Sequence, residues 1–417
     1  MKIRQLPEDF TVDEILDDDI LCNEVLNDID NSIKDTKNTK NIDDTNFNLY
    51  TLKKTNIENL KALSYVSKEF NIPLKNIGYC GLKDRHAITK QYITIPSNYG
   101  VLSINEKNLE LKYIKTIKKP LKIGDLKGNR FEITVRDIDK NDFLKIGENL
   151  RNLYIGAPNY YDEQRFGSVF HNKFIAKEYL KGNYENILNI LLTNYKKSEN
   201  KRIKDLKRYI KNNWNNWEKI LKYIKDNRIK SKMFVNIIKY LAYENNQVNY
   251  KEALKYVDDR LKKLFISAYQ SYLWNECVKE LLKNYIPKDE RIYLDYSCGT
   301  FLFYKKIDDN LLNELKNKTF PTIAPDINYN KFNEEYKAII SKVLKKEGVN
   351  LNDFNKLNEL GKLSYSERYI LSIPKNINYG TFKKDELNSG KYKITVEFEL
   401  NKGSYATIII KRIFNLI

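Results

Sequence analysis

The chain has 417 residues, of which 41% are hydrophobic and 31% are charged. This balance is typical of a globular protein of two or three domains, and it excludes a disordered chain. No segment approaches the ~20 consecutive apolar residues of a membrane-spanning helix. The first nine residues also lack the apolar stretch of a signal peptide. We therefore expect a soluble, cytoplasmic protein.

Basic residues outnumber acidic ones. Lysine and arginine total 73 against 55 acidic residues, which gives a net charge of +18. Such an excess favours a polyanionic partner, most simply a nucleic acid. A lysine-rich genome would produce the same excess, and composition alone does not separate the two explanations.

Residues that bind metals or act as nucleophiles are few. The four cysteines are Cys22, Cys80, Cys277 and Cys298. They are scattered without a C-x-x-C pair, which argues against a structural zinc site and against a disulfide framework. With only His86 and His171, a histidine-rich metal site is excluded. We expect no metal site, so catalysis would depend on carboxylates.

In chain order, the first clear elements lie before residue 140. Apolar residues recur with a helical period over Leu60–Phe70, and Pro73 follows. Two glycines in Ile77–Ala87 indicate a tight turn. Tyr92–Ile95 and Arg130–Val135 are rich in β-branched and aromatic residues, which predicts two strands.

The middle of the chain is predicted to be helical, from Phe174 to about Asn284, with no proline. Within it, 194–232 carries fourteen Lys or Arg against four acidic residues, interleaved with tyrosine and tryptophan. This stretch could be an RNA-facing surface. The alternative, which we favour, is an amphipathic helical region with core aromatics and a solvated basic face.

The C-terminal segment again predicts strands. Tyr392–Leu400 alternates polar and apolar residues, and Tyr405–Ile410 follows a turn, which predicts a hairpin. Strands at both ends with helices between them indicate an α+β domain closed by both termini. The helical middle would then be an insertion.

Asp84 is the strongest catalytic candidate because of the motif around it. A lone aspartate is usually a helix cap or a surface charge. Here Gly81–Gln91 reads G-L-K-D-R-H-A-I-T-K-Q. This segment resembles the signature G-x-K-D-[KR]-x-A-x-T-x-Q of the TruD family of tRNA pseudouridine synthases, and every fixed position matches.

Further blocks of the chain resemble motifs of the same family. They are Pro7–Phe10 (P-E-D-F, with a basic residue, Arg4, six positions before Phe10), Gly128–Phe131 (G-N-x-F), Pro158–Gly167 (P-N-Y-F-G-x-Q-R-F-G), Ala268–Asn275 (A-x-Q-S-x-L-F-N) and Gly403–Thr407 (G-S-[YF]-A-T). Tyr161 and Asp162 depart from the Phe and Gly of the third motif. Residues 183–250 match no pattern of the family. The chain thus resembles an archaeal-type member over nearly its whole length.

The resemblance implies a fold and a reaction. The fold would be α+β, with a pseudouridine-synthase catalytic domain built on a mixed, mainly antiparallel sheet and a largely helical α/β TRUD insertion domain. The catalytic domain would comprise 1–158 and 373–417, and the insertion 159–372. The reaction would be the isomerisation of uridine to pseudouridine at position 13 of tRNA, without a cofactor. The partner would be tRNA, with no membrane and no obligate protein partner.

The resemblance also implies roles for single residues. Asp84 would be the catalyst, attacking the base, attacking C1′ or deprotonating the sugar. Phe131, or second Phe10, would stack on the extruded base, and Arg4 would pair with Asp84 and keep it ionised. The full set of expected substrate-binding residues is Arg4, Phe10, Lys83, His86, Asn129, Phe131, Gln164 and Arg165.

Two other functions remain open at this point. One is a non-catalytic RNA-binding or chaperone protein on the same fold, which would have no need of the carboxylate in Lys83-Asp84-Arg85. The other is the same chemistry on another RNA or another uridine.

Overall fold

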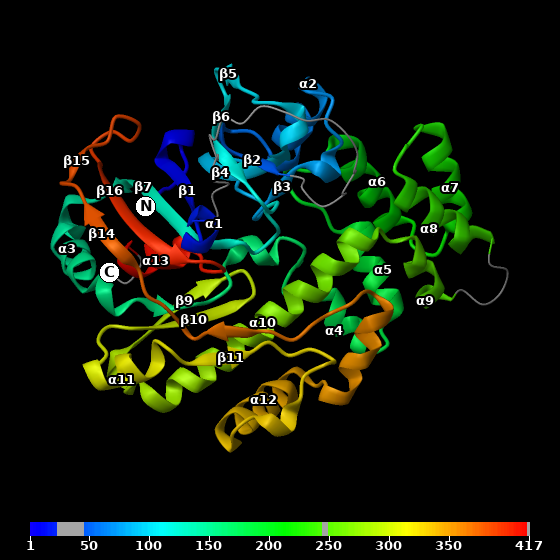
Figure 1. The fold of residues 1–417 in the computed structure, drawn as a ribbon. Coiled ribbons are helices and arrows are strands. Elements are labelled where there is room, and N and C mark those ends of the chain that lie inside the picture. The colour runs from blue at the N-terminus through cyan, green and yellow to red at the C-terminus, as the bar shows by residue number, and fades with distance from the viewer. Residues whose placement is uncertain (23–45, 244–248, 415–417) are drawn as a thin grey trace. The chain divides into compact units, whose positions relative to one another are not determined.

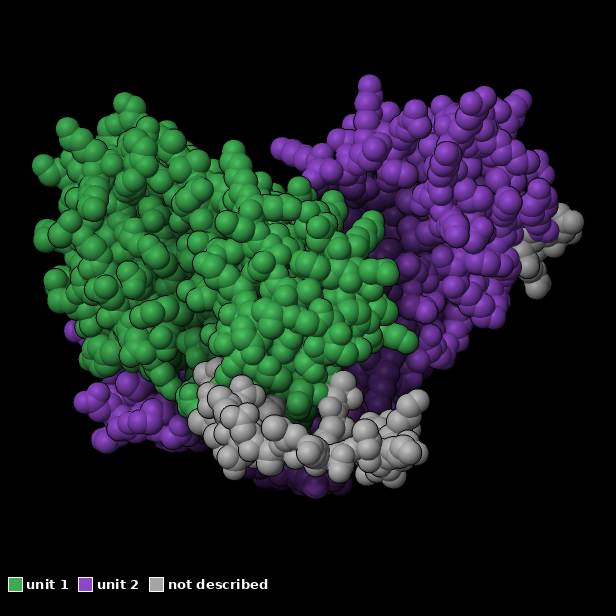
Figure 2. Space-filling view, turned by 45° about the horizontal axis from the view of Figure 1, so that its top comes forward, with its two compact units in different colours: residues 1–157, 372–417 green, residues 158–371 purple. Residues whose placement is uncertain are grey.

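The computed structural model describes residues 1–22, 46–243 and 249–414. The chain divides into two compact units (Figure 2). Unit 1 comprises Met1–Ala157 and Ser372–Ile417, and unit 2 comprises Pro158–Leu371. The two ends of the chain therefore fold together, and the middle forms a body of its own.

Unit 1 is built on a ten-stranded sheet with strand order β14-β16-β7-β1-β4-β2-β6-β5, where β15 also pairs with β16 and β3 with β4 (Figure 1). β1 and β4 run parallel, and the other neighbouring strands are antiparallel. This confirms the predicted α+β class with a mixed, mainly antiparallel sheet. The strands are β1 (Phe10–Leu16), β2 (Phe47–Thr55), β3 (Gly78–Tyr79), β4 (Ile88–Pro96), β5 (Ile104–Glu106), β6 (Leu109–Ile117), β7 (Leu126–Ile138), β14 (Lys375–Tyr379), β15 (Lys383–Lys384) and β16 (Tyr392–Asn401).

Buried side chains that alternate with more exposed ones along the strands form the core of unit 1. Every second residue of β16 from Ile394 to Leu400 is buried, as expected when one face of a sheet is covered. On the β2–β4–β6 side, Tyr50, Leu52 and Ile93 pack with apolar residues of helix α2 (Asn59–Glu69). This helix coincides with the predicted one to within one residue. The short helix α1 (Asp18–Cys22) follows β1.

The C-terminal segment corrects the predicted hairpin. Residues 405–410 were expected to form a strand, but α13 (Ala406–Phe414) is a helix, and it contacts α3 (Phe143–Arg151). Most of its side chains are buried, namely Ala406, Ile408, Ile409, Ile410, Arg412, Ile413 and Phe414. The run of isoleucines favours a strand by propensity, and burial of this apolar face overrides that preference.

Arg136 clamps the N-terminal segment to β7. Its side chain is buried, and its Nε donates to both carboxylate oxygens of Asp9 at 2.8 and 3.0 Å. Its Nη1 donates to Asp385 near the C-terminus at 3.0 Å. The backbones of Lys2 and Arg136 also exchange two hydrogen bonds of 2.8 Å. The short segment that carries Arg4 is therefore held on both sides before β1 begins.

Unit 2 is largely helical around α10 (Asp259–Tyr285), which is buried on all sides over most of its length. Two antiparallel pairs accompany the helices, β9 with β10 and β11 with β12. The other elements are α4 (Ile175–Leu180), α5 (Tyr184–Thr193), α6 (Lys201–Asn212), α7 (Trp217–Asp226), α8 (Lys232–Tyr243), α9 (Tyr250–Ala253), β9 (Arg291–Tyr296), β10 (Gly299–Tyr304), α11 (Asp309–Leu315), β11 (Thr319–Pro321), α12 (Glu334–Glu347) and β12 (Glu367–Tyr369). The short strands β8 (Ala157–Pro158) and β13 (Leu371–Ser372) mark where the chain passes between the units. No helix in the described part of the chain is long and apolar enough to cross a bilayer.

The basic stretch 194–232 forms α6 and α7. Tyr209 stacks on Tyr223 with ring centroids 3.9 Å apart, and Trp217 is buried, so these aromatics pack within unit 2. Lys207, which a solvated basic face would expose, is instead buried in an ion pair with Glu199 at 2.8 Å. Twelve of the fourteen Lys and Arg residues of this stretch are exposed, so the favoured prediction of core aromatics with a solvated basic face is confirmed, with Lys207 as its exception.

Candidate active site

Asp84 lies in the connection between β3 and β4. Gly78 in β3 has a steric reason to be glycine, because a Cβ there would lie 2.4 Å from Thr94 Oγ1 and 2.6 Å from the Leu121 carbonyl oxygen. Gly81 has none, since a Cβ would meet no atom within 4 Å. The tight turn predicted from the two glycines is therefore not formed, since Gly78 lies in β3 and Gly81 in an irregular stretch that leads to a partly exposed Asp84.

Arg4 pairs with Asp84, as the motif resemblance implied. Arg4 Nη2 donates to Asp84 Oδ2 at 2.7 Å, and the two side chains are 21% and 34% exposed. The Arg4 guanidinium also lies 3.9 Å above the ring of Phe10. Arg4 has a φ of 62°, a left-handed conformation that is unfavourable for a residue with a Cβ. Such a backbone persists where surrounding contacts hold it, here the clamp at Arg136.

The Lys83 side chain points into unit 1, where its ammonium is paired. Its Nζ lies 2.7 Å from Glu14 Oε1 and donates to Asn129 Oδ1 at 2.8 Å. The side chains of Lys83 and Glu14 are 7% and 0% exposed. Glu14 Oε2 in turn accepts from the Tyr92 backbone N–H at 2.8 Å. The ion pair therefore ties the Asp84 segment to β1, β4 and β7.

The two aromatic candidates lie in the core of the sheet. The rings of Phe10 and Phe131 meet edge to face with centroids 6.2 Å apart, and Phe398 contacts Phe131 on the next strand. Phe10 is 1% exposed and Phe131 is 7% exposed. Their stacking on a base stays a prediction. The neighbouring Gly128 allows β7 to approach β16, because a Cβ would lie 2.2 Å from the Leu400 carbonyl oxygen.

The remaining expected residues fall into two groups. His86 follows Asp84 in the same connection between β3 and β4, is exposed, and lies with Nδ1 3.1 Å from Asn56 Oδ1. Gln164 and Arg165 belong to unit 2, where Arg165 Nε donates to Ser271 Oγ at 2.9 Å. The structure thus brings together Arg4, Phe10, Lys83, Asp84, Asn129 and Phe131 within unit 1.

Sequence reasoning missed Lys54 and Glu14. Lys54 is fully buried, and its Nζ donates to the carbonyl oxygens of Asp84 at 2.6 Å and Ile57 at 2.9 Å. Glu14 is the carboxylate that receives Lys83. Both residues carried a signal, since Lys54 follows Leu52 and Glu14 follows Val12 at the inward spacing of two along a strand.

Burial changes the pKa of two groups near Asp84. Desolvation by burial lowers the pKa of Lys54 to about 8, although the charge of Asp84 opposes the change and that of Lys83 adds to it. Burial raises the pKa of Cys80 to about 12, helped by the charge of Glu14. The Cys80 thiol therefore stays protonated near neutral pH and is a poor nucleophile.

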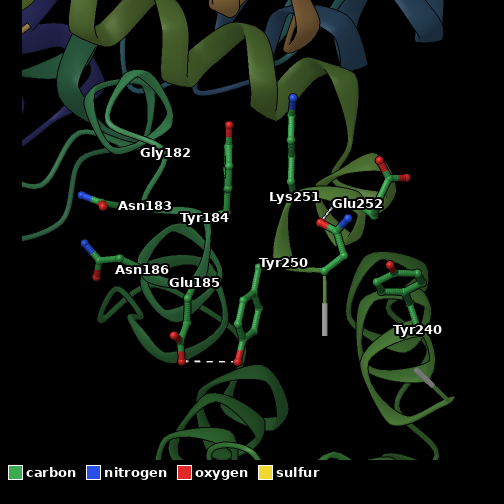
Figure 3. Close-up of a pocket in the computed structure, with 10 residues that line it drawn as sticks. Gly182, Asn183, Tyr184, Glu185, Asn186, Tyr240, Tyr250, Lys251 and Glu252 are labelled. Atoms are coloured by element: carbon green, nitrogen blue, oxygen red, sulfur yellow. Dashed lines mark hydrogen bonds between the residues drawn. The ribbon is translucent and has the colours of Figure 1, made fainter. Parts of the chain in front are cut away.

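The described residues contain no cluster of three or more His, Cys, Asp or Glu side chains with metal-binding geometry. Unit 2 contains a polar hollow of about 1160 Å³ between α5, α8 and α9 (Figure 3). Tyr184, Tyr240 and Tyr250 line it, and the Tyr250 hydroxyl donates to Glu185 at 3.3 Å. None of the expected site residues lines this hollow. The catalytic candidates therefore gather around Asp84 in unit 1.

Comparisons with known proteins find matches over nearly the whole chain. The family model described as tRNA pseudouridine synthase D (TruD) matches residues 1–413. The chain is 58% identical over 417 residues to "Probable tRNA pseudouridine synthase D 1" of Methanococcus maripaludis, covering 100% of both chains. It is 29% identical over 384 residues to "tRNA pseudouridine synthase D" of Aquifex aeolicus, covering 88% of this chain and 91% of that one.

A solved structure has the same fold. A TruD crystal structure from Methanosarcina mazei superposes with a TM-score of 0.67 at 23% sequence identity. The match covers 99% of this chain and 93% of the other. At this identity the likeness concerns the fold.

Proposed function

Because this chain belongs to the TruD family, we propose that it is a tRNA pseudouridine synthase that isomerises uridine, with Asp84 as the catalytic carboxylate and without a cofactor. The family model covers nearly the whole chain, and the 58% identical relative is named for this activity. The observation that carries the proposal is the Arg4–Asp84 pair, in which a partly exposed carboxylate is held by a fixed guanidinium at 2.7 Å.

The reaction fits one carboxylate. Isomerisation breaks the N1–C1′ bond of uridine, forms a C5–C1′ bond, removes the C5 proton and leaves N1 protonated. The change is redox-neutral, and no atom enters from another molecule, so the chemistry itself demands no cofactor. Attack on the base, attack on C1′ and deprotonation of the sugar each use the same ionised Asp84.

Arg4 suits the task of keeping Asp84 ionised. A base can be reached only after it leaves its stack, at a cost of a few kcal/mol, and the pocket that receives it loses water. Loss of water disfavours an ionised carboxylate unless a cation lies beside it. Arginine remains charged under these conditions, and its planar guanidinium matches a carboxylate.

We assign the remaining roles in the same way. Unit 1 would be the catalytic domain, and Phe131, or second Phe10, would receive the extruded uridine. Asn129 would contact the base, with Lys83 holding its side chain in place. Position 13 of tRNA would be the target.

The test is conversion of an unmodified tRNA transcript by the purified protein. Pseudouridine is mapped by carbodiimide modification followed by primer-extension stops, and we expect one new stop, at uridine 13. Asp84→Asn should give no stop. Asp139→Asn is its matched control, because Asp139 is an exposed carboxylate of unit 1 that pairs with Lys391. A stop at another uridine would change the assigned position. Binding without any conversion would favour a non-catalytic RNA-binding protein instead.

A further inference from the structure

Lys54 is a buried cation with an unusual set of partners. It lies in β2, and its side chain is completely inaccessible to solvent. Its Nζ donates to two backbone carbonyl oxygens, those of Ile57 at 2.9 Å and Asp84 at 2.6 Å. Within the described part of the chain it forms no salt bridge with a carboxylate. A lysine buried in this way is costly, so the contacts that it makes need an explanation.

The two carbonyls belong to segments that frame the candidate site. Ile57 lies between β2 and α2, and Asp84 lies in the connection between β3 and β4. The Lys54 ammonium therefore connects β2 with two other segments. One of them carries Asp84, whose carboxylate pairs with Arg4. Charge-assisted hydrogen bonds of this kind are shorter and stronger than neutral ones.

We propose that Lys54 is a positioning residue for the reaction, and that its buried ammonium fixes the Asp84 backbone so that the carboxylate keeps its geometry toward Arg4. This inference rests on the proposed catalytic role of Asp84. It goes beyond that role because Lys54 acts through the main chain and touches no substrate.

The charges around Lys54 make this role sensitive to pH. The titratable groups facing it are Asp84 and Lys83, and behind them lie Arg4, paired with Asp84, and Glu14, paired with Lys83. Its cross-strand neighbours are uncharged, Thr89 in β4 and Leu109 in β6. Burial lowers the pKa of Lys54 to about 8. As the pH rises through this value the ammonium loses its charge, its bonds to the carbonyls weaken, and the Asp84 segment is held less firmly.

The experiment measures single-turnover conversion of tRNA at saturating enzyme from pH 6 to 9.5. Lys54→Met removes the ammonium and keeps a similar shape. Lys54→Arg keeps a cation that does not titrate in this range. Lys53→Met is the matched control, since Lys53 precedes Lys54 on the same strand and is exposed. Thermal unfolding of each variant reports whether it is folded.

We expect Lys54→Met to be about 10- to 150-fold slower than the wild type at pH 7, the range expected for loss of one hydrogen bond to a charged group, here the bond to the Asp84 carbonyl. The wild type and Lys53→Met should lose rate above about pH 8. This loss should be absent from Lys54→Met and from Lys54→Arg, and Lys54→Arg should be faster than Lys54→Met at pH 7.

Several outcomes would overturn the inference. Lys54→Met could be slower with an unchanged pH profile, which would indicate a merely structural lysine, or it could match the wild type throughout. If Lys54→Met does not fold, Lys54→Arg is the deciding variant. A loss of rate above pH 8 in Lys54→Arg equal to that of the wild type would refute the positioning role. Asp84→Asn is measured in parallel. Activity in that variant would overturn the proposed catalyst, whereas an inactive Asp84→Asn with a wild-type Lys54→Met would overturn only the positioning role.

Discussion

Replacing Arg4 with alanine tests the central contact of the site. Two unit charges about 4 Å apart interact by about 4 kcal/mol at an effective dielectric constant of about 20. Solvent reduces this value, because the Asp84 side chain is 34% exposed. A hydrogen bond to a charged group contributes about 1.5–3 kcal/mol, and we take that range for the Arg4–Asp84 pair. Arg4→Ala should therefore slow single-turnover conversion roughly 10- to 150-fold.

The assay compares Arg4→Ala, Arg4→Lys and a matched loss of an exposed arginine. Arg4→Lys should keep part of the activity, because lysine supplies the charge without the planar guanidinium. The control is Arg130→Ala, which removes a 3.8 Å ion pair with Glu399 from a side chain that is 57% exposed. Exposed pairs contribute about 1 kcal/mol or less, so this variant should stay within about fivefold of the wild type. A wild-type rate for Arg4→Ala would refute the pairing as a contributor to the reaction.

Three further predictions concern catalysis, stability and binding. Asp84→Asn should abolish pseudouridine formation, while tRNA affinity, measured by filter binding, stays within a few-fold of the wild type. Turnover by this variant without deamidation would contradict the prediction. Burial opposes ionisation of Asp385, but hydrogen bonds from backbone and side-chain donors outweigh burial and lower its pKa from 3.8 to about 2. Its ionised form therefore contributes about 2 kcal/mol of stability above pH 4 that is lost as the pH falls toward 2, and urea unfolding of Asp385→Asn should lack this loss. Replacing the exposed Lys201, Arg202 and Lys211 of α6 with Glu should lower tRNA affinity. The slope of log K against log salt should fall by about 0.7–0.9 for each phosphate contact removed. An unchanged slope would place α6 outside the RNA-binding surface.

The sequence predicted those parts of the molecule that depend on local patterns. The helix near residue 60 follows from periodicity, which records which face is buried, and the strand around Phe131 follows from its β-branched and aromatic residues. The pairing of Arg4 with Asp84 followed from motif resemblance, because the two residues are far apart in sequence and no local pattern joins them.

The errors came from contacts with neighbouring segments, which local sequence patterns do not record. The isoleucines of α13 favour a strand when considered alone, and only the surface that they cover makes them helical. Lys207 belongs to a strongly basic run, but its burial depends on Glu199 and could not be read from charge counts. Lys54 lies at the inward spacing of its strand, which indicates burial, but its role depends on two carbonyl oxygens that no sequence pattern reveals.

The antiparallel pairing of β7 with β16 has a consequence for synthesis of the protein. β7 ends at Ile138, and its neighbour β16 begins at Tyr392, with all of unit 2 encoded between them. At about 5–20 residues per second, the ribosome would need on the order of 10–50 s to reach β16 after completing β7. During that interval one edge of β7 has no strand to pair with, and Arg136 lacks Asp385. Unit 1 can therefore be completed only after β16 has been synthesised, when unit 2 has already had time to fold.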